Sequence, residues 1–202
     1  MNLYAETNFI LELALQRSER GECATLLELA RGGRIRLLLP GYSVGEPYDA
    51  WVRRTRQRID LSRRIKTEIG ELGRSEAYAG SPEEFADIVK LLETSSREEK
   101  EQIDSVIGEV LDQADLIALT AEVFRAAKAA EAELSLTPQD AIVFASVVAD
   151  LELAPAGEKC FVTANAHDFN KPAIRERLGR HGCKLVTRFT DAVGFVRSRQ
   201  GH

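Results

Sequence analysis

Four short apolar runs, each bounded by polar residues, glycine or proline, predict β-strands. They cover residues 2–5, 35–39, 160–163 and 184–187. Such runs are typical of strands that are buried on both faces of a parallel sheet. Residues 18–30 carry an apolar stripe at helical spacing, which Gly32 and Gly33 end before the next strand. The pattern therefore predicts an α/β fold, with a parallel sheet, the first strand at its centre, and helices on both faces.

The central part of the chain reads as helical throughout. From about residue 44 to residue 151 no further strand is indicated, and strong helix formers dominate, as in the segment "AEVFRAAKAAEAEL". A simple crossover between parallel strands needs only one helix. We therefore expect a single domain over residues 1–202 that carries a large α-helical insertion, free of strands, at about residues 53–135.

The segment "TPQDAIVFASVVADL" predicts a helix of a different kind. Thr137 is a good N-cap and Pro138 suits the first helical position. Between residues 141 and 149 only Ser146 is polar, so most of this helix must be buried. Asp140 then lies in the first turn of a buried helix, at the rim of the core.

The three cysteines, Cys23, Cys160 and Cys183, are widely spaced and set among apolar residues. This pattern favours reduced, buried thiols over a disulfide framework or a zinc site. The start of the chain lacks a charged region followed by a long apolar stretch, and no run is long enough to span a bilayer. We therefore expect a cytoplasmic protein with no membrane segment.

Charge is unevenly distributed along the chain. The formal net charge is −5, which argues against a protein that coats nucleic acid nonspecifically. Residues 51–66, "WVRRTRQRIDLSRRIK", nevertheless hold seven basic residues against the single acid Asp60. This basic stripe, residues 53–66, is a candidate phosphate-binding surface, and its alternative interpretation is a solvated helix face.

Four acidic residues occupy similar places relative to the predicted elements. Glu6 ends the first strand and Glu46 follows the second, while Asp140 opens the buried helix and Asp168 follows the third strand. Because the carboxyl ends of parallel strands meet at one edge of a sheet, these side chains are expected to converge there. Carboxylates brought together repel each other unless a cation compensates them, and all-oxygen clusters suit Mg²⁺ or Mn²⁺.

Each acid also has a purely structural interpretation. Glu6 can be a solvated strand end, Asp140 a capping partner of Thr137, and Asp168 the cap of a following helix. Glu46 lies between Gly45 and Pro47, which predict a turn. The hypothesis of a metal site therefore depends on the four positions taken together.

The joint pattern resembles the PIN-domain family of metal-dependent nucleases. "YAETNFIL" resembles the first motif of that family, Glu46 its second acid, "LTPQDAIVFASVV" its third motif and "FVTANAHDF" its fourth. The resemblance covers residues 1–48 and 136–197 and leaves the middle helices outside. It implies a three-layer PIN-like fold and Mg²⁺- or Mn²⁺-dependent hydrolysis of RNA. For the compact toxin members of the family it also implies an antitoxin protein as a partner.

The resemblance implies roles for the four acids, and the basic stripe adds its first two arginines as candidate substrate ligands. The catalytic and metal-binding residues would be Glu6, Glu46, Asp140 and Asp168. The candidate substrate-binding residues are Thr7, Asn8, Asn165, Arg53 and Arg54. Thr7 would bind a water or a phosphate through its hydroxyl, and the two arginines would bring positive charge beside the acidic site.

Two departures keep an alternative open. The family usually has aspartate where this chain has Glu6, and the helical insertion exceeds that of the compact members. The alternative is a PIN-like module that binds RNA or a protein partner without cleaving anything. Association into a homo-oligomer is left open in either case. A phosphatase built on an Asp-x-Asp pair is disfavoured because position 8 is Asn8, and a dinucleotide site is disfavoured because no glycine follows the first strand.

Overall fold

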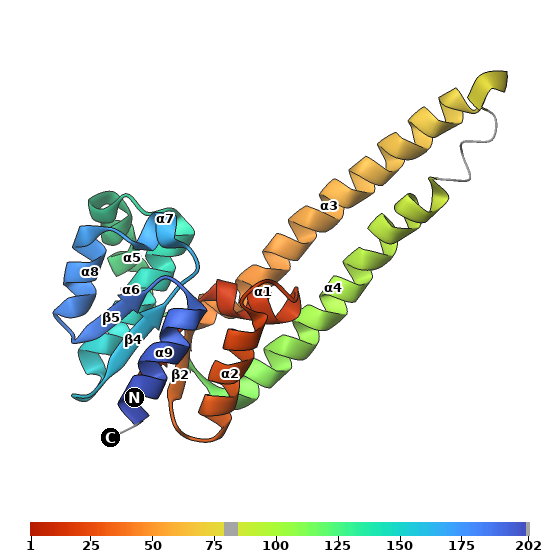
Figure 1. Ribbon diagram of the computed structural model, residues 1–202. Coiled ribbons are helices and arrows are strands. Elements are labelled where there is room, and N and C mark those ends of the chain that lie inside the picture. Colours follow the sequence, from red (N-terminus) through yellow and green to blue (C-terminus); the bar gives the residue numbers. More distant parts are fainter. Residues whose placement is uncertain (79–84, 201–202) are drawn as a thin grey trace.

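A five-stranded, all-parallel sheet forms the centre of the protein, seen in a computed structural model that describes residues 1–78 and 85–200 (Figure 1). The strands are β1 (Asn2–Tyr4), β2 (Arg36–Pro40), β3 (Ala114–Ile117), β4 (Lys159–Val162) and β5 (Cys183–Val186). Their order is β3-β2-β1-β4-β5, with Leu3 of β1 in register with Leu37 of β2 and Cys160 of β4. The prediction of a parallel sheet with the first strand at its centre is confirmed.

Helices pack on both faces of the sheet, and two of them, α3 and α4, extend beyond it. The helices of the described residues are α1 (Thr7–Ala14), α2 (Arg20–Arg31), α3 (Gly41–Leu72), η1 (Glu76–Tyr78), which follows α3 away from the sheet, α4 (Ala86–Gln113), α5 (Ala121–Leu134), α6 (Pro138–Leu153), α7 (Ala166–Phe169), α8 (Pro172–Gly179) and α9 (Phe189–Gln200). One hydrophobic core lies under α1, α2, α4 and α9, and the other lies under α5, α6, α7 and α8. Strand side chains alternate between them, so Leu3 enters the first core and Tyr4 the second.

The four predicted strands agree with the structure to within one residue at each end. Apolar runs bounded by turn residues therefore located every strand that is buried on both faces. The helix predicted for residues 18–30 is α2, and Gly33 after it has φ of +66°, a conformation that glycine adopts without strain. Thr137 caps α6 as predicted, because its hydroxyl accepts a hydrogen bond from the Asp140 amide at 3.2 Å.

The prediction that residues 53–135 contain no strand is wrong. Residues 114–117 form β3, which pairs in parallel with β2 at the edge of the sheet. Asp115 and Leu116 are exposed, so β3 lacks the continuous apolar run that marked the other strands. Its sequence reads as the end of a helix, and pairing with β2 imposes the extended conformation. The helix α5 that follows packs on α6, so residues 114–134 belong to the α/β body.

The helices α3 and α4 form a long antiparallel hairpin, the arm, whose outer part extends away from the α/β body (Figure 1). Polar contacts join the two helices along its length. The Trp51 indole donates a hydrogen bond to the Ser96 carbonyl at 2.7 Å, and Arg58 pairs with Glu99 at 2.6 Å. Both members of that ion pair are only 23% exposed. Hydrogen bonds and ion pairs therefore join the two helices of the arm, beside apolar contacts such as those that bury Val89 of α4.

No single helix of residues 1–78 and 85–200 is long and apolar enough to cross a membrane; α5 and α6 meet such a test only as a pair, bent by 117°.

All three cysteines are buried, and Cys160 and Cys183 enter opposite cores although their strands are neighbours. Burial raises the pKa of Cys160 to about 12, and burial also raises the pKa of Cys183 to about 12. We expect a thiol reagent to label none of the cysteines in the native protein at pH 8 and all three after unfolding in guanidinium, because the reactive thiolate is suppressed. Rapid stoichiometric labelling of the native protein, followed by absorbance, would contradict this burial.

Candidate functional site

An acidic cavity of about 220 Å³ opens at the carboxyl edge of the sheet, beyond the ends of β1, β2 and β4. Four structural segments contribute to its wall: the start of α1, the first turns of α3, the first turn of α6 and the loop before α7. It is lined by Glu6, Thr7, Asn8, Leu11, Tyr42, Glu46, Asp49, Ala50, Arg53, Gln139, Asp140, Val143, Asn165 and Phe169. Four of these side chains are carboxylates and one is cationic.

Glu6 lies at the junction of β1 and α1 and is only 5% exposed. Its carboxylate is the N-cap of α1, since it accepts hydrogen bonds from the Asn8 amide at 2.8 Å and from the Asn8 side chain at 3.0 Å. The Ala164 amide, beyond the end of β4, donates to the same carboxylate at 3.4 Å. Glu6 therefore joins the ends of two neighbouring strands as well as lining the cavity.

The sequence predicted a turn around Glu46, and this prediction is wrong. Glu46 is helical and lies near the start of α3. The helix runs from Gly41 to Leu72 and includes Pro47, which is buried. A proline within a helix loses one backbone hydrogen bond. Contacts of α3 with α1, β2 and α6 offset this loss. The low helix propensity of proline alone did not predict that the helix continues through Pro47. As a helical residue, Glu46 forms part of the cavity wall.

The residues that follow Glu6 bind carboxylates of the site. The Thr7 hydroxyl donates a hydrogen bond to Glu46, so the start of α1 orients an acid of α3. Asn8 donates to Glu6 through its side-chain amide. Both residues line the cavity, but in this arrangement their polar groups are engaged by the acids and not turned to a substrate.

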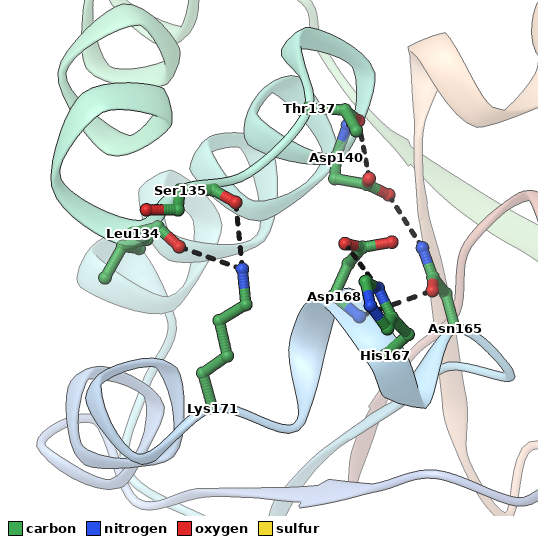
Figure 2. Close-up of polar contacts among 8 residues, drawn as sticks. All are labelled: Leu134, Ser135, Thr137, Asp140, Asn165, His167, Asp168 and Lys171. Atoms are coloured by element: carbon green, nitrogen blue, oxygen red, sulfur yellow. Dashed lines mark hydrogen bonds and ion pairs between the residues drawn. The ribbon is translucent and has the colours of Figure 1, made fainter.

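Asp140 and Asn165 meet at one side of the cavity (Figure 2). One Asp140 oxygen accepts a hydrogen bond from the Thr137 hydroxyl at 2.5 Å, and the other accepts one from the Asn165 side-chain amide at 3.2 Å. The capping interaction proposed as the structural alternative for Asp140 is therefore present, and it coexists with the position of Asp140 in the cavity wall.

Asp168 lies beside the cavity and does not line it. It is the third residue of α7, and its amide donates to the Asn165 side-chain oxygen at 3.4 Å. Its carboxylate pairs with the exposed His167 ring at 3.1 Å (Figure 2). Hydrogen bonding to Asn165, and then to His167, lowers the pKa of Asp168. Asn165 thus connects Asp168 to Asp140. The fourth carboxylate of the cavity wall is that of Asp49 and not that of Asp168.

The two arginines proposed as substrate ligands occupy different environments. Arg53 lines the cavity and is exposed, whereas Arg54 lies outside the cavity wall. Burial, and then the charge of Arg54, lowers the pKa of Arg17 on the adjoining surface. Within the rest of the basic stripe, Arg58 and Lys66 pair with acids of α4 and therefore contribute to the arm.

The electrostatics of the cavity oppose ionisation of Glu6 and Glu46. Burial raises the pKa of Glu6 to about 7, against the opposing effect of the hydrogen bonds from Asn8, and the charge of Glu46 contributes further. Burial also raises the pKa of Glu46, and the charges of Asp140 and Asp49 add to that rise. Desolvated acids that repel each other are costly to keep ionised, and a bound cation would remove the cost.

The donor set is chemically suited to a hard divalent cation, because carboxylate oxygens of Glu6, Glu46, Asp49 and Asp140 border one cavity. The acids are nevertheless not arranged as a finished metal centre. Within the described ranges, no three His, Cys, Asp or Glu side chains are grouped closely enough to hold a metal ion. A cation bound here would compete with the Thr7 and Thr137 hydroxyls for carboxylate oxygens.

The sequence did not indicate three polar residues of the cavity wall, Tyr42, Asp49 and Gln139, or Thr163 behind the wall. Tyr42, Glu46, Asp49 and Arg53 recur at spacings of four, three and four, which is one stripe of a helix. The stripe becomes visible only if the segment is taken as helical, and Gly45 with Pro47 argued against that. Thr163 is fully buried after β4 and accepts a hydrogen bond from the Asn165 amide at 2.9 Å.

Comparisons with models of protein families, with curated protein sequences and with solved structures find no match to this chain. The assignment of a function therefore depends on the cavity and on the motifs that build it.

We expect Glu6→Gln to flatten the pH dependence of stability in a chelator. The folded-state pKa of about 7 exceeds the ordinary value of 4.5, so the folded protein retains a proton that the unfolded chain releases. The unfolding free energy therefore falls as pH rises from 4.5 to 7, by about 3 kcal/mol from this group. Urea denaturation should show Glu6→Gln to be more stable than the wild type at pH 8 and similar at pH 4.5.

Glu109→Gln, at an exposed position of α4, is the matched control and should leave the pH dependence unchanged. If Glu6→Gln keeps the slope of the wild type, the Glu6 carboxylate is better solvated than its burial indicates.

Proposed function

We propose that this protein is a PIN-like ribonuclease that hydrolyses RNA phosphodiester bonds with Mg²⁺ or Mn²⁺. One observation carries the proposal: Glu6, Glu46, Asp49 and Asp140 border a single cavity at the carboxyl edge of a parallel sheet, with Arg53 as the cationic side chain of the wall. Ligand sites of open α/β sheets lie at this edge. Desolvated acids such as Glu6, held beside further carboxylates, reduce stability, and such clusters are maintained where function requires them.

The side chains divide into those that would hold the cation and those that would orient them. Glu6, Glu46 and Asp140 would provide the ligands, with Asp49 beside them and Asp168 reached through Asn165. When bound, a divalent cation lowers the pKa of an attacking water and offsets negative charge on the phosphate. Thr7 orients Glu46, and Asn8 orients Glu6, through the hydrogen bonds described above.

RNA is the proposed substrate. Its phosphates would be repelled by the acidic wall, but a divalent cation held by the acids would attract them. Arg53 lies at the same wall and offers a phosphate contact beside the metal position. The family resemblance adds an antitoxin protein as the proposed partner of a toxin activity.

A binding module without catalysis is the second candidate. The carboxylates of Glu6, Glu46 and Asp140 each accept a hydrogen bond from a neighbouring side chain, so the cavity is satisfied in part without a cation. The longer side chain of Glu6, where the family has aspartate, points the same way. Cation binding separates the two candidates, since a pure binding module has no need of a metal.

We expect Asp140→Asn to reduce Mn²⁺-dependent cleavage of a labelled RNA by at least about 100-fold. Calorimetric Mn²⁺ affinity should fall by at least about tenfold. The melting temperature in chelator should stay unchanged or rise slightly, because the introduced amide keeps an acceptor for the Thr137 hydroxyl while one repelling charge is removed.

Glu152→Gln, at an exposed position of the same helix, is the matched control for Asp140→Asn. It should leave cleavage, Mn²⁺ affinity and melting temperature unchanged. A sharp loss of stability in Asp140→Asn, with no effect of Mn²⁺ on either protein, would reduce Asp140 to a helix-capping residue and would favour the binding module.

We expect Arg53→Gln to weaken binding of a short single-stranded RNA and to reduce the slope of log affinity against log salt by about one unit. The loss of one phosphate contact beside the cavity is the reason. Arg56→Gln, three residues further along α3 and outside the cavity wall, is the control and should change the slope little. Equal effects of both variants in a filter-binding salt titration would assign RNA binding to diffuse charge and not to the cavity.

A further inference from the structure

The outer part of the arm carries apolar side chains that its own two helices do not cover. Leu61 of α3 is 45% exposed and Ile88 of α4 is 48% exposed, and Leu72 and Leu91 are also exposed. Figure 1 shows that this part of the arm extends away from the α/β body, so the body does not shield these residues. A lone pair of helices in water gains little stability when its apolar side chains stay exposed.

The apolar residues gather on one face of the arm, the arm groove. The groove has a volume of about 650 Å³ and is bordered by Leu61, Ile65 and Leu72 of α3, by Phe85, the N-cap of α4, and by Ile88 of α4. On α3 these residues are four and seven apart, the spacing of a stripe that packs against another helix. Exposed apolar grooves of this kind mark interaction surfaces.

The charges of the two helices are opposite. Over their full lengths α3 has seven basic and five acidic residues, whereas α4 has eight acidic and three basic residues, and all seven basic residues of α3 lie in the basic stripe. Arg58 with Glu99 and Lys66 with Glu93 show that the two helices attract each other within one chain. Arg63 and Arg64 border the arm groove as well, and Arg64 has no counterion among the ion pairs of the described residues.

We propose that the arm groove is a homodimer interface, in which the arms of two copies form a four-helix bundle. In a twofold arrangement the two α3 helices can lie on one diagonal and the two α4 helices on the other, so that each basic helix has an acidic helix on both sides. The same pattern that holds one hairpin together then recurs between the chains. Because the apolar face includes residues from both helices, a second copy offers a matching surface.

The charge pattern favours a second copy over an unrelated helix. A strongly acidic partner helix would fit α3 but would be repelled by α4, and a basic one would be repelled by α3. A hairpin with one helix of each sign complements both helices at once. The interface lies on the arm, so this inference is independent of the activity proposed for the cavity.

The test is the mass of the full chain in solution. Sedimentation equilibrium of the wild type at micromolar concentrations should give twice the 22.4 kDa mass of the chain. The double variant Leu61→Glu/Ile88→Glu should give the mass of one chain, with the dimer dissociation constant raised by at least about 100-fold, because charges enter the centre of the interface. Circular dichroism should show unchanged helix content, since both positions are exposed in the monomer.

Two further variants sharpen the outcome. Leu153→Glu adds a charge at a leucine of the α/β body that is 88% exposed, and it should leave the dimer intact. Arg63→Glu/Arg64→Glu should weaken the dimer most at low salt, because it removes attraction to an acidic α4. A wild type that stays monomeric overturns the proposal and leaves the arm groove to a different partner. A dimer that Leu61→Glu/Ile88→Glu does not weaken also overturns it.

Discussion

The burial of β1 between two hydrophobic cores is the constraint on which the cavity depends. β1 has three residues, and Leu3 and Tyr4 are fully buried on opposite faces. Parallel pairing on both sides sets its register against β2 and β4, so the ends of the three strands coincide. The chain segments that follow these strand ends therefore lie close together, and the cavity forms between them.

The same burial makes the first carboxylate costly. Glu6 lies two residues beyond the end of the central strand, where water has little access, and its hydrogen bonds from Asn8 and Ala164 offset only part of the desolvation. The protein thus places a desolvated acid at its most constrained point and surrounds it with Glu46 and other acids. Capping of α1 accounts for Glu6, but it does not account for the other acids of the cavity wall. Binding of the proposed cation would account for all of them.

The arm is stabilised by a different balance of forces. Near the body, its helices pack on α1 and share the first hydrophobic core through residues such as Ile103 and Val110 of α4. Further out, ion pairs such as Arg58 with Glu99 supplement a narrow apolar contact that includes Val89. Partly exposed ion pairs contribute little stability each. An arm of this length with an uncovered apolar face is therefore expected to gain stability by association.

The sequence by itself determined the strands that are buried on both faces, the glycine end of α2, the capped and buried helix α6 and the burial of the cysteines. In each case the information is local: a run of apolar residues, a helical period or a cap residue. The positions of Glu6 and Asp140 at the cavity followed from the same rules. Only the tertiary structure decided the rest. Pairing with β2 made residues 114–117 a strand, and packing carried α3 through Pro47, which brought Asp49 into the wall and left Asp168 outside. These outcomes depend on contacts between distant segments, whose energy exceeds the local preferences that the sequence displays.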